Sequence, residues 1–167
     1  MKITDCLDYY ELNKRIKSFP DYYVCLETID KCLTYSFVIV YSVFTLCLAF
    51  ADVHYLVVSS AVNLFFLFIV SLIRIITSSE RPYSKYKFEP LIEITNTNRS
   101  FPSRHMFSAV AISLTVLEYS YIASFVLLIE AFALGTIRII SGVHYLKDII
   151  VGASFGIISG IIILFLK

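Results

Sequence analysis

Residues 149–166 read IIVGASFGIISGIIILFL, a run of 18 residues without a charged side chain. An apolar helix of this length approaches the roughly 20 residues that are needed to cross the hydrocarbon core of a bilayer. Within the run, Gly152, Gly156 and Gly160 recur at every fourth position, so they fall on one face of the helix. Such a face lets a neighbouring helix approach closely. The stretch therefore predicts a membrane helix that packs inside a bundle.

Four further apolar blocks precede this run, over residues 33–51, 55–76, 106–119 and 121–140. All but the third are long enough to span a membrane. Only Glu118, Tyr119 and Ser120 separate the third block from the fourth, which predicts an antiparallel hairpin. Hydrophobic residues make up 58% of the 167-residue chain and charged residues 16%, a balance that excludes an ordinary soluble domain. The sequence thus predicts an all-α, polytopic transmembrane helical bundle of about five to six spans.

Two polar segments complete the chain. Residues 1–31 mix charges with aromatic side chains and lack the apolar core of a cleaved signal. We expect them to form either an amphipathic helix on the membrane surface or a loosely ordered tail, ahead of a transmembrane domain over residues 32–167. Residues 77–104 form a long loop, which is typical of a functional segment. No basic tract indicates a nucleic acid partner, and the four cysteines follow no metal-ligand spacing.

Polar residues mark the ends of the apolar blocks. If the spans alternate in direction, four of these ends lie on the same side of the membrane, and they carry Arg74, Arg81, His105, Arg138, His144 and Asp148. Guanidinium groups offer forked donors that match the oxygens of a tetrahedral anion such as phosphate. One arginine at a helix end is more often a snorkelling anchor. Three on one side indicate an anion site.

Two histidines bring reactive groups to this side. Ser103 occupies the N-cap position of the third block, where free N–H groups favour an anion. His105 follows it and can donate a proton to a leaving group. His144 and Asp148 are four residues apart and can meet if the stretch is helical. A carboxylate on one imidazole nitrogen makes the other a better nucleophile. A histidine at a helix start, or a histidine four residues before an aspartate, more often has only a structural role. The neighbouring arginines favour a catalytic role here.

Three motifs together, Arg74-x6-Arg81-Pro82, Pro102-Ser103-Arg104-His105 and Arg138-x5-His144-x3-Asp148, resemble the signature of the type 2 phosphatidic acid phosphatase superfamily, which includes vanadium-dependent haloperoxidases. The resemblance implies that His144 attacks phosphorus and forms a phosphohistidine, that Asp148 orients it, and that His105 protonates the leaving group. It implies phosphate binding by Arg74, Arg81, Ser103, Arg104 and Arg138. It also implies a reaction without a metal or other cofactor, because arginines supply the positive charge.

Three positions depart from the family pattern. Arg74 stands where the family usually has lysine, which keeps the charge but changes the reach. Arg104 replaces a glycine, so its side chain can add charge to the entrance or crowd it. Ile137 replaces a serine, which removes one minor hydrogen bond. None of these changes removes a group that makes or breaks bonds.

The expected substrate is a lipid phosphate, because the predicted site lies at the bilayer surface without a soluble cap domain. Candidates are phosphatidic acid, phosphatidylglycerophosphate and undecaprenyl diphosphate. The expected partners are the lipid phosphate substrate and the surrounding membrane lipids. The small size and the Ile/Lys/Tyr bias favour a bacterial cell membrane as the location. A non-catalytic anion-binding membrane protein, such as a transporter subunit, and a haloperoxidase are the alternatives.

The charge distribution bears on the orientation of the site. All Lys and Arg residues except Lys167 fall on the active-site side of the predicted topology. The positive-inside rule would make that side cytoplasmic. Family members with an outward-facing site are nevertheless common, so both orientations stay open.

Overall fold

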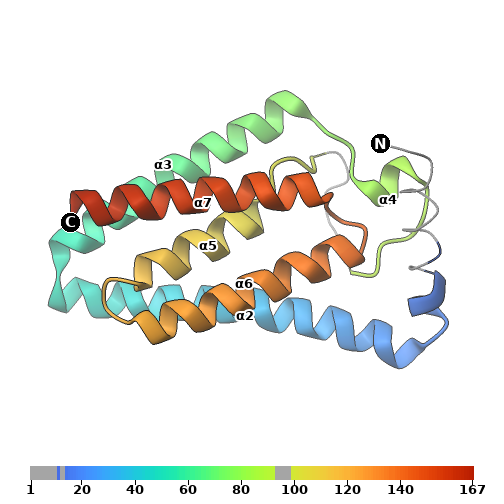
Figure 1. Ribbon diagram of the computed structural model, residues 1–167, viewed down its shortest axis with the longest axis horizontal. Helices are drawn as coiled ribbons and strands as arrows, with labels where there is room; N and C mark the ends of the chain where they lie inside the picture. Colours follow the sequence, from blue (N-terminus) through green and yellow to red (C-terminus); the bar gives the residue numbers. More distant parts are fainter. Residues whose placement is uncertain (1–10, 12–13, 93–98) are drawn as a thin grey trace.

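The chain folds as a bundle of helices that run lengthwise beside one another (Figure 1). The computed structural model describes residues 11, 14–92 and 99–167. The long elements are α2 (Pro20–Ala51), α3 (Val53–Thr77), α5 (Arg104–Val116), α6 (Tyr121–Ile140) and α7 (Leu146–Leu166). A short helix, α4 (Pro82–Lys85), lies in the connection between α3 and α5. The described residues contain no strand, and the all-α prediction is confirmed.

Four of the helices, α2, α3, α6 and α7, are long and apolar enough to cross a membrane. The third apolar block forms α5, whose 13 residues rise only about 20 Å, less than the ~30 Å hydrocarbon core. Large apolar side chains cover the outside of the bundle. Phe50, Ile122 and Phe165 are more than four-fifths exposed, as side chains facing lipid are. The protein is therefore a multi-pass membrane protein, and its described residues form four membrane-length helices around a shorter one.

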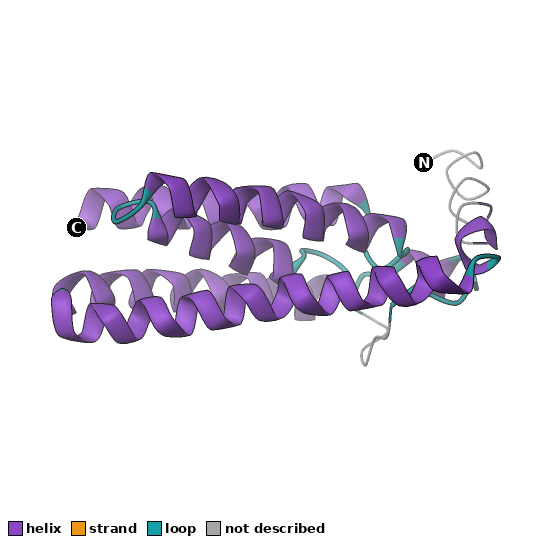
Figure 2. Cartoon of the chain, turned by 90° about the horizontal axis from the view of Figure 1, so that it is seen from below, coloured by secondary structure: helices purple, strands orange, loops and turns teal. Residues whose placement is uncertain are grey.

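The alternating direction of the helices gathers the polar connections at one end of the bundle. The start of α2, the end of α3, helix α4, the start of α5 and the α6–α7 connection lie at this end, on the right in Figure 1. The α2–α3 turn, the α5–α6 turn and the C-terminus lie at the opposite end (Figures 1 and 2). The predicted alignment of helix ends is confirmed.

Helix α7 packs closely on α5 through its glycine face, formed by Gly152, Gly156 and Gly160. A Cβ atom placed on Gly152 would lie 2.5 Å from the carbonyl oxygen of Ser103, and one on Gly160 would lie 2.5 Å from Cβ of Leu114. Gly156 meets a similar limit. No larger residue fits at these separations unless the helices move apart. The close approach predicted from the four-residue glycine spacing is thus confirmed.

The amino-terminal part of α2 is polar. This helix begins at Pro20, ahead of the apolar block that starts at Leu33, so residues 20–31 continue directly into the first membrane-length helix. Residues 1–10 and 12–13 of the predicted amino-terminal segment lie outside the described residues. The division of the chain at residues 31 and 32 stays a prediction.

Candidate active site

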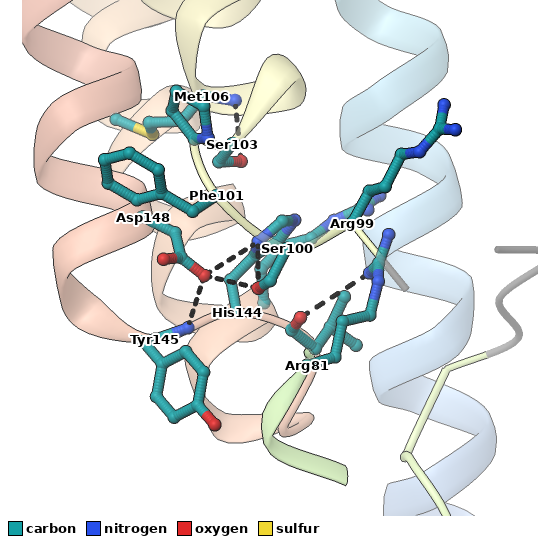
Figure 3. Close-up of polar contacts among 12 residues, drawn as sticks. Arg81, Arg99, Ser100, Phe101, Ser103, Met106, His144, Tyr145 and Asp148 are labelled. Atoms are coloured by element: carbon teal, nitrogen blue, oxygen red, sulfur yellow. Dashed lines mark hydrogen bonds and ion pairs between the residues drawn. The ribbon is translucent and has the colours of Figure 1, made fainter. Parts of the chain in front are cut away.

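His144 and Asp148 are in contact and buried at the polar end of the bundle (Figure 3). His144 is 2% exposed and Asp148 is fully buried. Nδ1 of His144 lies 3.4 Å from Oδ2 of Asp148. Because an ionised carboxylate only accepts hydrogen bonds, Nδ1 carries the ring proton and the lone pair lies on Nε2. The ring is therefore prepared to act as a nucleophile through Nε2.

The two residues meet through the cap of α7 and not within one helix. His144 lies in the connection before α7, whereas Asp148 belongs to the first turn of this helix. Oδ2 of Asp148 accepts a 3.0 Å hydrogen bond from the backbone N–H of Tyr145, and Tyr145 is the N-cap residue. The contact predicted from the four-residue spacing is present, but a capping box brings the residues together. The same carboxylate thus starts the helix and orients the histidine.

Ser100 completes this pair, and its contribution was not predicted from the sequence. Its buried hydroxyl donates a hydrogen bond to Oδ2 of Asp148 and lies 3.3 Å from Nδ1 of His144. The only indication in the sequence is its position three residues before Ser103, at the end of the long loop. A serine in a polar loop is common, so this position alone carries little information.

Arg81 lies beside His144, directly before α4 (Figure 3). The arginine is 6% exposed, and its Nη1 donates a long, 3.5 Å hydrogen bond to the carbonyl of Val143. Its Nε has no hydrogen-bond partner in the part of the chain that the structure describes. A buried guanidinium with a donor to spare next to a nucleophilic imidazole is suited to hold the oxygens of a phosphate.

Arg74 is occupied by the loop that leads into α5. Its Nη1 donates to the carbonyls of Ser100 at 3.0 Å and Pro102 at 2.7 Å, and its Nη2 donates to the carbonyl of Arg99. This guanidinium is 6% exposed. The structure therefore brings Arg74 to the site, but directs both of its terminal nitrogens at the backbone that carries Ser100.

Ser103 and Arg104 begin α5, as predicted. The hydroxyl of Ser103 accepts a 3.4 Å hydrogen bond from the backbone N–H of Met106, which confirms the N-cap. The backbone N–H of Ser103 donates to the carbonyl oxygen of Asp148 at 3.0 Å, so the starts of α5 and α7 are joined. The side chain of Arg104 is exposed and lies toward a cavity on the other side of this turn.

His105 pairs with Arg138, and Arg138 pairs with an acid that was not predicted from the sequence. Nη1 of Arg138 lies 3.3 Å from Nδ1 of His105. Nε and Nη2 of Arg138 donate to the two carboxylate oxygens of Asp30 at 2.8 and 2.9 Å. Asp30 belongs to α2, which carries none of the three motifs. An acidic residue one turn before an apolar block is the only indication that the sequence offers.

A cavity of about 330 Å³ opens next to His105. Helices α2, α3, α5 and α6 enclose it, and most of its surface is apolar. Its lining residues are Thr34, Phe37, Val38, Leu67, Arg104, His105, Ser108, Ala109, Ile112 and Leu134. Val38 is 57% exposed on the outer surface of α2, so the cavity reaches the face of the bundle that contacts lipid.

Burial and nearby positive charges lower the pKa of both histidines, which favours their neutral form near pH 7. Burial lowers the pKa of His144 from its ordinary value of 6.5 to about 4, although the hydrogen bond from its ring to Asp148 opposes this shift. The protein atoms around His105 and the positive charge of Arg138 lower the pKa of that ring as well, even though it faces the cavity. A neutral His144 is the form that can attack phosphorus.

The fold and these side chains define a class of protein, a helical membrane protein with a cluster of arginines and histidines at one end of the bundle. The sequence model of the PAP2 superfamily, the type 2 phosphatidic acid phosphatases, matches residues 53–166. The chain belongs to this superfamily, and the resemblance carried by the three motifs is confirmed. This membership supports a phosphatase activity.

Three known proteins resemble the chain to different extents. The chain is 31% identical over 84 residues to the bacitracin transport permease protein BcrC of Bacillus licheniformis, over 46% of this chain and 41% of that relative. The crystal structure of Aquifex aeolicus LpxE superposes with a TM-score of 0.72 at 24% identity, over 84% of this chain and 86% of that chain, which shows a shared fold. A PAP2-type phosphatidylglycerolphosphate phosphatase from Bacillus subtilis superposes with a TM-score of 0.48 at 17% identity, covering 95% of this chain and 92% of that chain.

Proposed function

We propose that the protein is an integral membrane phosphatase that hydrolyses a lipid phosphate or diphosphate through a phosphohistidine on His144. The observation that carries this proposal is the orientation of His144, whose Nδ1 faces Asp148 and Ser100 while Nε2 retains its lone pair. Arg81 lies beside the ring, and its charge would stabilise the phosphoryl oxygens. A buried, neutral imidazole with a free lone pair is better suited to attack phosphorus than to bind an anion, because it carries no positive charge.

The reaction proceeds in two steps. The lone pair of Nε2 in His144 attacks phosphorus, the bond from phosphorus to the leaving oxygen breaks, and His105 gives that oxygen a proton. A water molecule then gives a proton to His105 and attacks the phosphohistidine, which releases phosphate and restores Nε2. Arg81 and Arg138 balance the charge on the phosphoryl oxygens in both steps. Arg74 acts in this scheme through the loop that it binds.

A lipid substrate fits the surroundings of His105. The apolar cavity is lined by His105, the proposed acid, and it extends between α2, α3, α5 and α6. An acyl or isoprenyl chain in this cavity would bring its phosphate next to His105. Phosphatidic acid, phosphatidylglycerophosphate and undecaprenyl diphosphate are the candidate substrates. Arg104 at the cavity would hold further phosphate oxygens of such a headgroup.

The proposed reaction needs no metal ion. Guanidinium groups supply the positive charge that divalent metals supply in other phosphatases. Among the described residues, no group of three His, Cys, Asp or Glu side chains is placed to hold a metal. We expect EDTA to leave phosphate release intact. A loss of activity on EDTA that one divalent ion restores would contradict this part of the proposal.

The proposed location is the cell membrane of a bacterium, in keeping with the bacterial sources of the relatives reported above. The orientation of the site can be measured with a cysteine at Ser84, in the short helix α4, after the native cysteines are removed. Labelling of this cysteine by an impermeant thiol reagent in intact cells would place the site outside. Protection until the cells are opened would place it in the cytoplasm.

A panel of lipid phosphates and diphosphates, offered to the detergent-purified protein with inorganic phosphate as the readout, tests the activity. His144→Ala should abolish phosphate release from every substrate that the wild-type protein cleaves. His54→Ala is the matched control, because His54 lies in the first turn of α3, at the opposite end of the bundle. Release that survives in His144→Ala would exclude the mechanism.

A transporter subunit is the second candidate function, because the name of the Bacillus licheniformis relative describes a transport permease. Such a protein would use the arginines to bind an anion without cleaving it. It would bind lipid phosphates with no release of inorganic phosphate, and His144→Ala would leave binding unchanged. The same panel therefore separates the two functions.

A further inference from the structure

A buried ion pair joins the start of α2 to the end of α6. Asp30 is 6% exposed and Arg138 is 8% exposed. Nε and Nη2 of Arg138 donate to Oδ1 and Oδ2 of Asp30 at 2.8 and 2.9 Å, the side-on geometry of a bidentate pair. A carboxylate within a membrane-length helix is costly to bury and usually marks a functional position. None of the three motifs accounts for Asp30.

The ion pair with Asp30 uses Nε and Nη2 of Arg138. The remaining nitrogen, Nη1, points at His105 and lies 3.3 Å from its Nδ1. Arginine has no acceptor atom, so Arg138 must be the donor in this contact. Nδ1 of His105 is then the acceptor, and the ring proton lies on Nε2. While this hydrogen bond is present, Nδ1 cannot be protonated, so the ring cannot become an imidazolium. His105 is therefore held in one neutral tautomer.

We propose that Asp30 is a positioning residue that makes the protonation of His105 depend on bound phosphate. Asp30 holds Arg138 so that Nη1 donates to Nδ1 of His105. A phosphate offers stronger acceptors, and Nη1 turns to one of its oxygens. Nδ1 then takes a proton from solvent, and the imidazolium can deliver the proton on Nε2 to the leaving oxygen. The inference deepens the proposed function and rests on it for the roles of His105 and Arg138.

The charges around His105 agree with such a dependence. The groups that act on its ring are Arg138 of α6, Arg81 ahead of α4, His144 ahead of α7 and its own neighbour Arg104. All of these groups are cationic or neutral. Through Arg138, Asp30 adds a negative charge, which partly offsets them. A bound phosphate dianion would add the remaining negative charge that an imidazolium needs.

Nitrogen NMR of the three histidines tests the proposal without turnover. In ¹⁵N-histidine-labelled protein in detergent, the empty wild type should show His105 neutral at pH 7, with its proton on Nε2. Inorganic phosphate or orthovanadate should convert it to the imidazolium. In Asp30→Asn, the single tautomer should give way to a mixture. The pH at which anion-bound His105 takes its proton should fall by about one unit, the order expected for one lost neighbouring charge.

Glu27→Gln is the matched control, because Glu27 lies one turn earlier on α2 and pairs with Lys31 at 2.7 Å. This variant should leave the spectrum of His105 unchanged. Asp30→Glu keeps the charge and should retain the wild-type pattern, which covers the case in which Asp30→Asn does not fold. A wild-type pattern in Asp30→Asn would overturn the proposal, and so would a charged His105 in the empty wild type.

Kinetics provide the second readout. The alkaline limb of kcat, which reports the acid in the substrate complex, should move to lower pH by about one unit in Asp30→Asn, and kcat well below this limb should approach the wild-type value. A pH-independent loss of kcat would indicate a purely structural role and overturn the proposal. If the wild type releases no phosphate, the proposed function fails while the NMR coupling can still be observed. If turnover is present but neither readout responds to Asp30, only the present inference fails.

Discussion

Ser100 and Asp148 are joined by a buried hydrogen bond between the loop before α5 and the first turn of α7. The carboxylate oxygen that accepts from Ser100 is the one that faces Nδ1 of His144. The orientation of the proposed nucleophile thus depends on a loop residue 44 positions earlier in the chain. This relationship leads directly to a prediction for Ser100.

Ser100→Ala should lower kcat by about 10- to 100-fold, the effect of losing one hydrogen bond to a charged group of ~1.5–3 kcal/mol. KM should change little, because Ser100 acts on Asp148 and not on the substrate. Steady-state kinetics on the best lipid substrate measure both constants. Ser113→Ala is the control, since the buried hydroxyl of Ser113 donates only to the carbonyl of Ala109 in its own helix. An unchanged kcat in Ser100→Ala would show that the hydrogen bond is dispensable.

Arg74→Ala should lower both thermal stability and kcat. The change leaves the buried carbonyls of Ser100 and Pro102 without this donor, and each unsatisfied buried group costs roughly 1–3 kcal/mol. Arg74→Lys, which introduces the residue usual in the family, should recover only part of the loss because an ammonium lacks the forked geometry. Thermal unfolding in detergent and kcat on one lipid substrate measure the two effects. A raised KM with unchanged stability would instead indicate that Arg74 binds substrate phosphate directly.

Gly152→Ala should destabilise the bundle by about 1–3 kcal/mol, the usual cost of overpacking. Its added methyl group would lie 2.5 Å from a backbone oxygen, which cannot move aside without shifting the start of α5. Gly135→Ala should cost less, because its methyl group would meet only side-chain atoms, at 3.2 Å. Melting temperatures of the two variants provide the comparison. Equal losses would mean that the glycine face is not the tightest contact.

Val38→Trp should raise KM for long-chain lipid phosphates several-fold, because it narrows the cavity from the α2 side and even 1 kcal/mol of lost binding is about fivefold. Hydrolysis of a short, water-soluble phosphate ester should change little. Val43→Trp is the matched control, since Val43 is 55% exposed on the same helix and does not line the cavity. Equal effects on long and short substrates would argue against a chain-binding cavity.

The stability of the empty protein should fall as the pH is lowered from about 6.5 to 4. Burial lowers the pKa of His144 from 6.5 to about 4 in the folded state, so the unfolded chain binds its proton first. The free energy of unfolding then declines by at most about 1.4 kcal/mol per pH unit for this group. Melting temperatures across this range measure the decline, and His144→Gln should make it shallower. An equally steep decline in His144→Gln would assign the effect to other groups.

Local patterns predicted the parts of this structure that depend on local spacing. The apolar blocks and the cap at Ser103 follow from periodicity and neighbouring residues. The four-residue spacing also predicted the contact of His144 with Asp148, although the cap of α7, and not a continuous helix, brings the two together. The contact between Asp30 and Arg138 joins residues 108 positions apart and depends on how α2 packs beside α6. Spacing along the chain carries no information about such a contact. For the same reason the loop contacts of Arg74 were not predicted, although its presence at the site was.

The glycine face of α7 has a further consequence for the alignment of α7 on α5. Because the glycines of α7 repeat every four positions, a slide of α7 by about 6 Å along α5 would move each glycine to the place that the next one occupies now. Packing alone therefore specifies the register weakly. Two polar connections remove the ambiguity. The backbone carbonyl of Asp148 accepts from the N–H of Ser103 at one end. Farther along α7, Ser159 donates at 2.7 Å to Asn63 of α3, which donates at 3.1 Å to Thr115 of α5. The segment that bears Asp148, the proposed catalytic carboxylate, thus also sets the helix alignment on which its own position depends.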